Sequence, residues 1–138
     1  MATAEKNILD RPGKYNLSEL NIISYQQVDN QPRFIDIKGI TLTLSITEDI
    51  FSNNIMGSII VYDTQDIRTM LPITGLERLS MKLNTPGLPG YDMSEKTGVP
   101  FQIYKVDSVR KDEQSDVGQF YKIYFCSPEM YYLSLIHI

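Results

Sequence analysis

Residues 40–47 read Ile-Thr-Leu-Thr-Leu-Ser-Ile-Thr, so aliphatic and hydroxyl side chains alternate without a break. This period of two is typical of a β-strand with one buried and one polar face, because successive side chains of a strand point to opposite sides. We predict a strand here, with its aliphatic face inside the core. Aspartate at Leu42 or Leu44 is then expected to abolish folding, whereas Thr43→Asp is expected to be tolerated.

The segments around this strand favour an all-β chain with one short helix. Ile35 and Ile37 lie on the opposite parity from the aliphatic residues of 40–47, which predicts a bulge or bend at Gly39. A short helix is predicted over 65–71, where Pro72 would end it. Further strands are predicted where β-branched and aromatic residues gather between turn formers: 20–28, 56–62, 76–83, 101–109 and 119–127. The last two are expected to form a long hairpin.

Two segments are predicted to lack regular structure. Residues 1–18 hold few apolar side chains and suit an irregular arm. Residues 85–100 are rich in proline and glycine, which predicts a long exposed loop. The backbone polar groups of both segments would lack partners within the sheet, so we predict that they contact other subunits. The candidate interface residues are Arg11, Pro12, Gly13, Pro86, Gly87, Pro89, Gly90 and Tyr91.

Composition narrows the function classes. The chain has 138 residues, of which 42% are apolar, enough for the core of one ordinary domain. Its formal net charge of -4 would repel a phosphate backbone, which disfavours sequence-reading nucleic-acid binding. The first twenty residues contain no uninterrupted apolar stretch, so neither a signal peptide nor a membrane insertion is expected, and the chain is expected to be made in a cytoplasm.

The sequence offers little for catalysis. Its one cysteine, Cys126, and one histidine, His137, cannot assemble a metal site or an activated nucleophile. The carboxylate pairs Glu48 with Asp49 and Asp63 with Asp66 lie beside turns, where acidic residues commonly cap or are solvated. We therefore predict no catalytic, cofactor-binding or metal residue and no enzyme activity. Cys126 is expected to be a buried, inert thiol.

The last predicted hairpin mixes basic and aromatic residues. Such a mixture can bind single-stranded nucleic acid, but acidic residues are interspersed, and a solvated hairpin with cross-strand ion pairs explains the pattern better. The residues concerned are Tyr104, Lys105, Arg110, Lys111, Tyr121, Lys122 and Tyr124, with Asp107, Asp112, Glu113 and Asp116 among them.

The C-terminal residues 133–138 read Leu-Ser-Leu-Ile-His-Ile and follow Tyr131-Tyr132 without a closing signal. The same six residues result from translating a transposon-end adapter used in shotgun sequencing libraries. We interpret 133–138 as derived from that adapter, and we expect the native chain to continue beyond Tyr132. The expected organisation is an arm over 1–18 and one truncated domain over 19–132.

Several short motifs resemble the N-terminal part of the baseplate hub, or central spike, proteins of contractile-tailed T4-like bacteriophages. They occur in the same order as in that family and cover roughly residues 9–70, whereas the match weakens beyond Ile73. The motifs are Leu9-Asp10-Arg11-Pro12-Gly13, Asn16-Leu17-Ser18, Arg33-Phe34-Ile35, Thr41-Leu42-Thr43, and Tyr62-Asp63-Thr64 running into Asp66-Ile67 and Thr69.

This resemblance implies a tail-tube-like antiparallel β-barrel in a structural virion protein of the tail baseplate. It further implies a homotrimer in which paired barrels form a ring. That ring would join the tail tube, or tube-initiator proteins, to a spike or lysozyme-type cell-puncturing protein, and DNA would pass non-specifically through its lumen. Assembly is expected in the host cytoplasm.

Other functions remain open on the sequence alone. A tail-tube or secretion-tube subunit would share the barrel but form homohexameric rings. A monomeric β-sandwich could bind carbohydrate or peptide through the tyrosine-rich hairpin. An enzyme whose active site lies in a missing C-terminal part is the third alternative.

Overall fold

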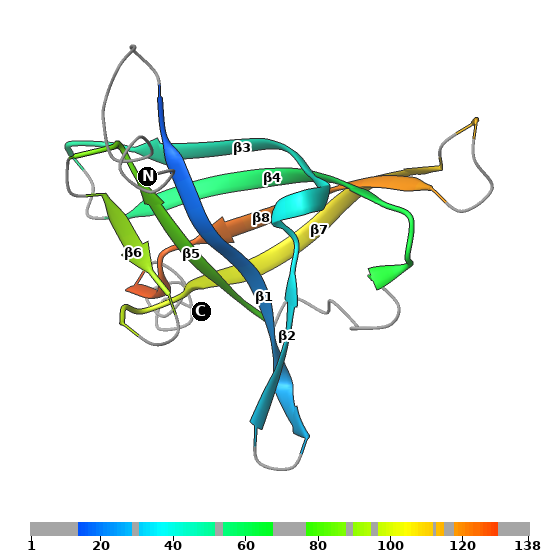
Figure 1. Cartoon of the computed structure of the whole chain (residues 1–138), viewed down its shortest axis with the longest axis horizontal. Coiled ribbons are helices and arrows are strands. Elements are labelled where there is room, and N and C mark those ends of the chain that lie inside the picture. The colour runs from blue at the N-terminus through cyan, green and yellow to red at the C-terminus, as the bar shows by residue number, and fades with distance from the viewer. Residues whose placement is uncertain are drawn as a thin grey trace, which may run out of the picture.

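The computed structural model describes residues 14–28, 31–51, 54–67, 77–87, 90–94, 97–111, 113–114 and 118–129. The fold is mainly β, and its strands form one curled antiparallel sheet (Figure 1). The elements are β1 (Asn16–Val28), β2 (Gln31–Asp36), the 3-10 turn η1 (Lys38–Ile40), β3 (Thr41–Glu48), β4 (Ile55–Asp63), β5 (Arg78–Asn84), β6 (Tyr91–Met93), β7 (Phe101–Lys111) and β8 (Gln119–Cys126). The strand order is β2-β1-β5-β7-β8-β4-β3, with β6 paired to β5.

The sheet curls into a half-barrel because its two edge strands are consecutive in the chain. Only residues 37–40 separate β2, at one edge, from β3, at the other. The buried Ile37 donates its N–H to the Leu20 carbonyl at 3.0 Å, and the Thr41 hydroxyl donates to the Ile37 carbonyl at 2.8 Å. The 3-10 turn thus lies against both β1 and β4 and draws the two edges together at that end.

The expected bend at Gly39 is a 3-10 turn, and a shift in the strand register follows it, between Thr41 and Thr43 of β3. Lys38–Ile40 form a 3-10 turn, and the strands before and after it lie at opposite edges of the sheet. The expected bend therefore separates two strands rather than kinking one. A bulge and a tight turn shift the side-chain alternation in the same way, so the pattern alone does not distinguish them.

The core fills the concave face of the sheet. In β8 the buried Tyr121, Ile123 and Phe125 alternate with Phe120, Lys122 and Tyr124 on the convex face. The Phe101 and Phe125 rings pack with centroids 4.8 Å apart. The other fully buried members of this cluster are Leu20, Ile22, Ile37, Ile59, Val61, Leu79, Met81 and Ile103.

The strand predicted over 40–47 exists, but its aliphatic face is not buried as expected. None of the side chains of β3 is fully buried, and Leu42 is 58% exposed. Leu44 and Ile46 are partly buried against the core. The period of two identifies the apolar face of a strand correctly, yet β3 is an edge strand, so only one side of it is covered.

Other predictions are confirmed in part. The hairpin of β7 and β8 is confirmed, with register shifts after Ile103 and Asp107. The first strand begins earlier than expected, at Asn16, because β5 pairs with β1 along this stretch. The predicted helix over 65–71 is not confirmed: Gln65 is a bend, Asp66 has a φ of 55°, and residues 68–76 lie outside the described residues.

Candidate functional site

The predicted interface residues are only partly placed by the structure. Arg11, Pro12, Gly13 and Pro89 lie outside the described residues. The connection from β5 to β6 brings together the other four positions, of which Pro86 is buried whereas Gly87 and Gly90 are exposed. Gly87 has a φ of 79°, a left-handed conformation that glycine adopts without a steric cost. The backbone of Tyr91 belongs to β6.

The long loop predicted over 85–100 is in fact partly ordered against the sheet. Tyr91, Asp92 and Met93 pair with Leu83, Lys82 and Met81 of β5, respectively. The expectation that this segment cannot satisfy its backbone within the sheet is therefore wrong for 91–93. Glycine and proline density shows where a chain turns, but it does not show that a short strand lies between two turns.

A side-chain network fixes the turn after β6. The Ser94 and Thr97 hydroxyls each donate to one carboxylate oxygen of Asp92 at 2.6 Å, and the Gly98 N–H donates to the Ser94 carbonyl at 3.0 Å. Hydrogen bonds from Ser94, and next from Thr97, hold the pKa of Asp92 below its usual value of 3.8. This part of the predicted interface is thus held by its own contacts.

The convex face of β7 and β8 combines aromatic and basic side chains. The Lys122 and Lys105 ammonium groups lie 5.1 and 5.5 Å from the centroid of the Tyr124 ring, and the Tyr104 ring lies 6.1 Å away. Lys105 also forms an exposed salt bridge with Asp107 at 3.3 Å. Cation–π contacts therefore hold both lysines beside Tyr124. This salt bridge lies within β7, and Asp107 also lies opposite Lys122 of β8 in the strand register.

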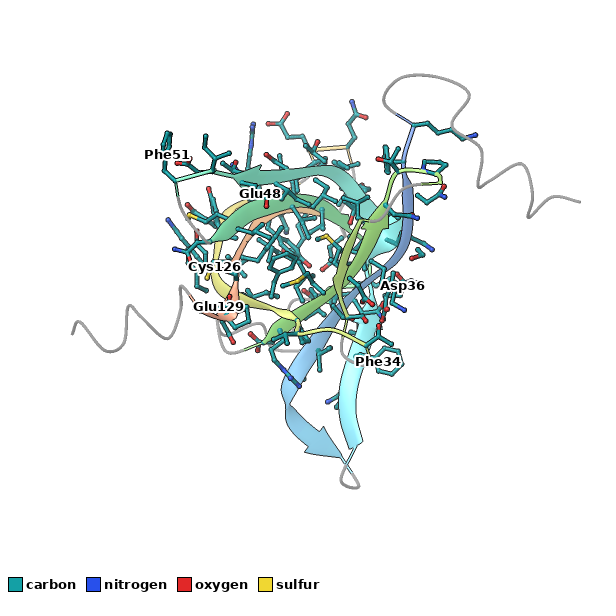
Figure 2. The ribbon with its side chains drawn as sticks, turned by 90° about the vertical axis from the view of Figure 1, so that its left-hand side faces the viewer. Phe34, Asp36, Glu48, Phe51, Cys126 and Glu129 are labelled. Carbon is teal, nitrogen blue, oxygen red and sulfur yellow. The ribbon has the colours of Figure 1, made fainter. Side chains whose placement is uncertain are left out.

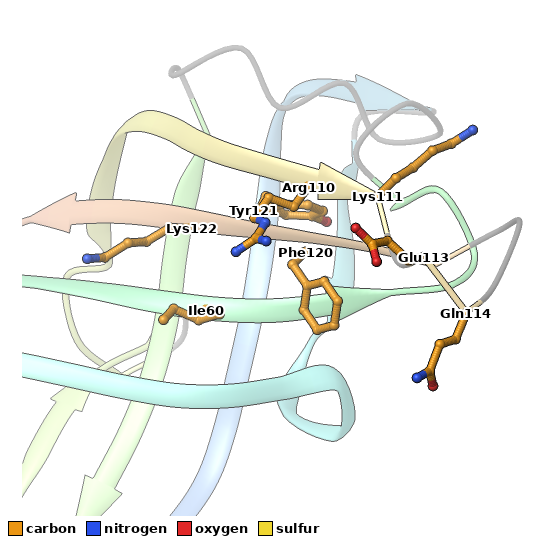
Figure 3. Close-up of a pocket in the computed structure, with 8 residues that line it drawn as sticks. All are labelled: Ile60, Arg110, Lys111, Glu113, Gln114, Phe120, Tyr121 and Lys122. Atoms are coloured by element: carbon orange, nitrogen blue, oxygen red, sulfur yellow. The ribbon is translucent and has the colours of Figure 1, made fainter.

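A shallow pocket of about 780 Å³ opens further along the same face (Figure 3). Its basic members are Arg110, Lys111 and Lys122, its aromatic member on this face is Phe120, and Glu113 lies among them. One carboxylate within a basic cluster lowers the attraction for a polyanion. The pocket can hold a small polar group, but it is not a strongly electropositive groove.

The carboxylates considered for acid–base chemistry have structural partners. Asp63 is buried and accepts hydrogen bonds from the Tyr121 hydroxyl and the Gln65 N–H, both at 3.0 Å. Asp66 accepts one from the Gln119 side chain, and Asp49 accepts one from the Phe51 N–H, each at 3.0 Å. These contacts are those of caps and core hydrogen bonds.

Cys126 is buried as predicted, and burial raises the pKa of its thiol. His137 lies outside the described residues. Within the described ranges, no group of three or more histidine, cysteine or carboxylate side chains is placed to bind a metal ion. In the same ranges, no helix is both long and apolar enough to cross a membrane.

An open seam runs where the half-barrel fails to close. On one side of β3 lies β4; on its other side, among the described residues, no strand is paired with it. A groove of about 880 Å³ follows this free side. Its walls are the start of β1, the end of β5 and the inner face of β3, and its lining residues are Lys14, Tyr15, Leu17, Lys38, Thr41, Leu42, Leu44, Ile46 and Leu83.

The turn after β3 carries apolar side chains that sequence reasoning missed. Ile50 is 93% exposed and Phe51 is 91% exposed, and Figure 2 shows Phe51 projecting from a corner of the molecule. The signal was present, because this apolar pair stands between Glu48-Asp49 and the turn formers 52–54. Large apolar side chains in a segment of turn residues have no core to enter, so they indicate a contact surface.

No protein-family model, curated protein or solved structure matches this chain.

Proposed function

We propose that this chain is a structural subunit of a phage tail baseplate, the central hub that joins the tail tube to the spike or cell-puncturing protein. The observation that carries the proposal is the ordered series of motifs over residues 9–70 that resembles the hub family. A curled antiparallel sheet is compatible with the tail-tube-like barrel of such a hub.

The surfaces described above suit assembly better than small-molecule binding. Among the residues that the structure describes, the seam leaves one edge of β3 unpaired, and unpaired strand edges readily pair with other chains. Several large apolar side chains are also exposed, namely Tyr15, Phe34, Leu42, Ile50, Phe51 and Val99. In the proposed ring, subunit contacts would cover part of this surface. DNA would pass through the lumen without specific contacts, since the chain has a net charge of -4.

The proposal is tested by the genomic setting and by the particle. Long reads across the locus should place this chain among tail and baseplate genes. Electron microscopy of the protein encoded there should show threefold rings. A locus among unrelated genes would overturn the proposal.

One observation supports a second candidate function. The Tyr104–Tyr124 pair and its two lysines form a surface on which a sugar or peptide could stack. A binding module of this kind would be a monomer. Sixfold rings, by contrast, would favour a tail-tube or secretion-tube subunit.

A further inference from the structure

The seam groove and the turn after β3 are complementary in chemistry. We call Leu17, Leu42, Leu44 and Leu83, with Lys14 and Lys38 beside them, the seam groove; these are part of the lining given above. We call Ile50 and Phe51, which follow directly after Glu48 and Asp49, the apolar knob. One surface is an apolar hollow and the other an apolar projection.

The knob is held in an exposed position by its own turn. The Asp49 carboxylate accepts a hydrogen bond from the Phe51 N–H at 3.0 Å, which is the local contact of an Asx turn. This bond fixes the backbone while the side chains of Ile50 and Phe51 remain more than nine-tenths exposed. Because the backbone of the knob is already ordered, docking loses less conformational entropy than it would for a flexible turn.

The groove offers an apolar floor with a basic rim. Leu42 is 58% exposed, and Leu17, Leu44 and Leu83 are packed against the core beneath it. Among the described residues that line the groove, two are lysines and none is a carboxylate. The acidic flank of the knob therefore matches the basic rim of the groove.

A knob cannot fill the groove of its own molecule in this structure, because Ile50 and Phe51 are almost fully exposed. We propose that the apolar knob of one copy of this chain docks in the seam groove of a second copy. Each copy then carries one knob and one groove, so the contact is head-to-tail, and such contacts build closed rings or open chains. This inference rests on the proposed function only in that both place several copies of this chain in one assembly, and it names a direct contact between two copies.

The test uses the full 138-residue chain and three variants. Phe51→Ser removes the knob, and Leu42→Glu places a like charge opposite Asp49 in the groove. Phe34→Ser is the matched control, because Phe34 is a phenylalanine that is 64% exposed and belongs to neither surface. Circular dichroism melting confirms that each variant is folded, and sedimentation velocity over a concentration series measures association.

We expect the unaltered chain and Phe34→Ser to associate equally, whereas Phe51→Ser and Leu42→Glu each weaken association at least about tenfold, as loss of a buried aromatic anchor does. Mixing the two weakened variants should restore one intact contact and yield dimers that do not grow further. An isologous contact between two knobs would instead leave Leu42→Glu fully associating, and that result would overturn the proposal.

Failure of this contact is distinguishable from failure of the hub function. If rings form unchanged in the Phe51→Ser variant, the proposed knob-and-groove contact is wrong, whereas the proposed hub function is not contradicted. If the gene lies among unrelated genes, the proposed hub function is wrong. The mixing experiment would still test whether the knob docks in the groove. A monomeric unaltered chain at every concentration would overturn the contact.

Discussion

Gly57 of β4 has no Cβ atom, and this allows close packing against Ser45 of β3 and Phe125 of β8. A Cβ atom there would overlap the Phe125 ring and the Ser45 carbonyl oxygen, and the carbonyl cannot move without its strand. We expect Gly57→Ala to lower the free energy of unfolding by about 1–3 kcal/mol, the usual cost of overpacking a core. Urea unfolding measures it.

The control is Gly39→Ala, because a Cβ at Gly39 would meet nothing within 4 Å. This variant is expected to stay within about 0.5 kcal/mol of the parent chain, as surface substitutions usually do. Equal unfolding free energies for the two alanine variants would contradict the packing described for Gly57.

The Asp92 carboxylate predicts a pH dependence. Its pKa is lower in the folded chain than its ordinary value of 3.8, because Ser94 and Thr97 donate hydrogen bonds to it. A lowered carboxylate pKa contributes stability above the unfolded-state value, and that contribution is lost as the pH falls through the folded-state value. Asp92→Asn should therefore lower the Tm at pH 7, and the two melting curves should converge in acid, below 3.8. A constant difference in Tm at every pH would contradict this.

At the scale of the element, two leucines of β3 differ in burial although they occupy equivalent positions in the alternating sequence. Leu44 packs against the core, whereas Leu42 is 58% exposed. We expect Leu44→Asp to lower the free energy of unfolding by about 2–4 kcal/mol, since it places a charge at a partly buried site. Leu42→Asp should change it by less than about 1 kcal/mol.

Thermal and urea unfolding of both β3 variants provide the measurement. Ile59→Asp serves as a positive control, because Ile59 is fully buried opposite Leu44 and should not tolerate a charge. If Leu42→Asp and Leu44→Asp lost equal stability, β3 would not be the exposed edge described here.

The same strand shows how far the sequence predicts the fold. Alternation identified β3, and runs of β-branched and aromatic residues identified β4, β7 and β8, because both signals are local in the sequence. Which strand lies at an edge depends on pairings between distant residues, such as Asn16 with Asn84, and no local pattern contains them. Of the candidate site, composition predicted a loop over 85–100, whereas strand β6 within it and the exposure of Phe51 were found only in the structure.

At the scale of the whole molecule, charge is expected to keep duplex DNA away. The chain has a formal net charge of -4. On the surface of the β7–β8 hairpin, which we call the basic face, Asp107 and Glu113 lie among Lys105, Arg110, Lys111 and Lys122. We expect no binding of a labelled duplex by fluorescence anisotropy at physiological salt, since too few phosphates would be neutralised.

A double variant provides the contrast for the DNA measurement. Asp107→Asn with Glu113→Gln removes both acids from the basic face, and it should give weak binding that falls steeply with salt. Strong, salt-sensitive binding by the unaltered chain would contradict the balance of charge described here.

The short link between the two sheet edges limits how far the molecule can flatten. Strands β2 and β3 lie at opposite ends of the strand order, yet residues 37–40 tie them together. The far ends of both strands are not tied by this link, so the seam can widen there while the curvature at η1 is kept. The two edges of the half-barrel are therefore joined at one end only. Cutting the chain at Gly39 would leave a sheet whose two edges are no longer connected.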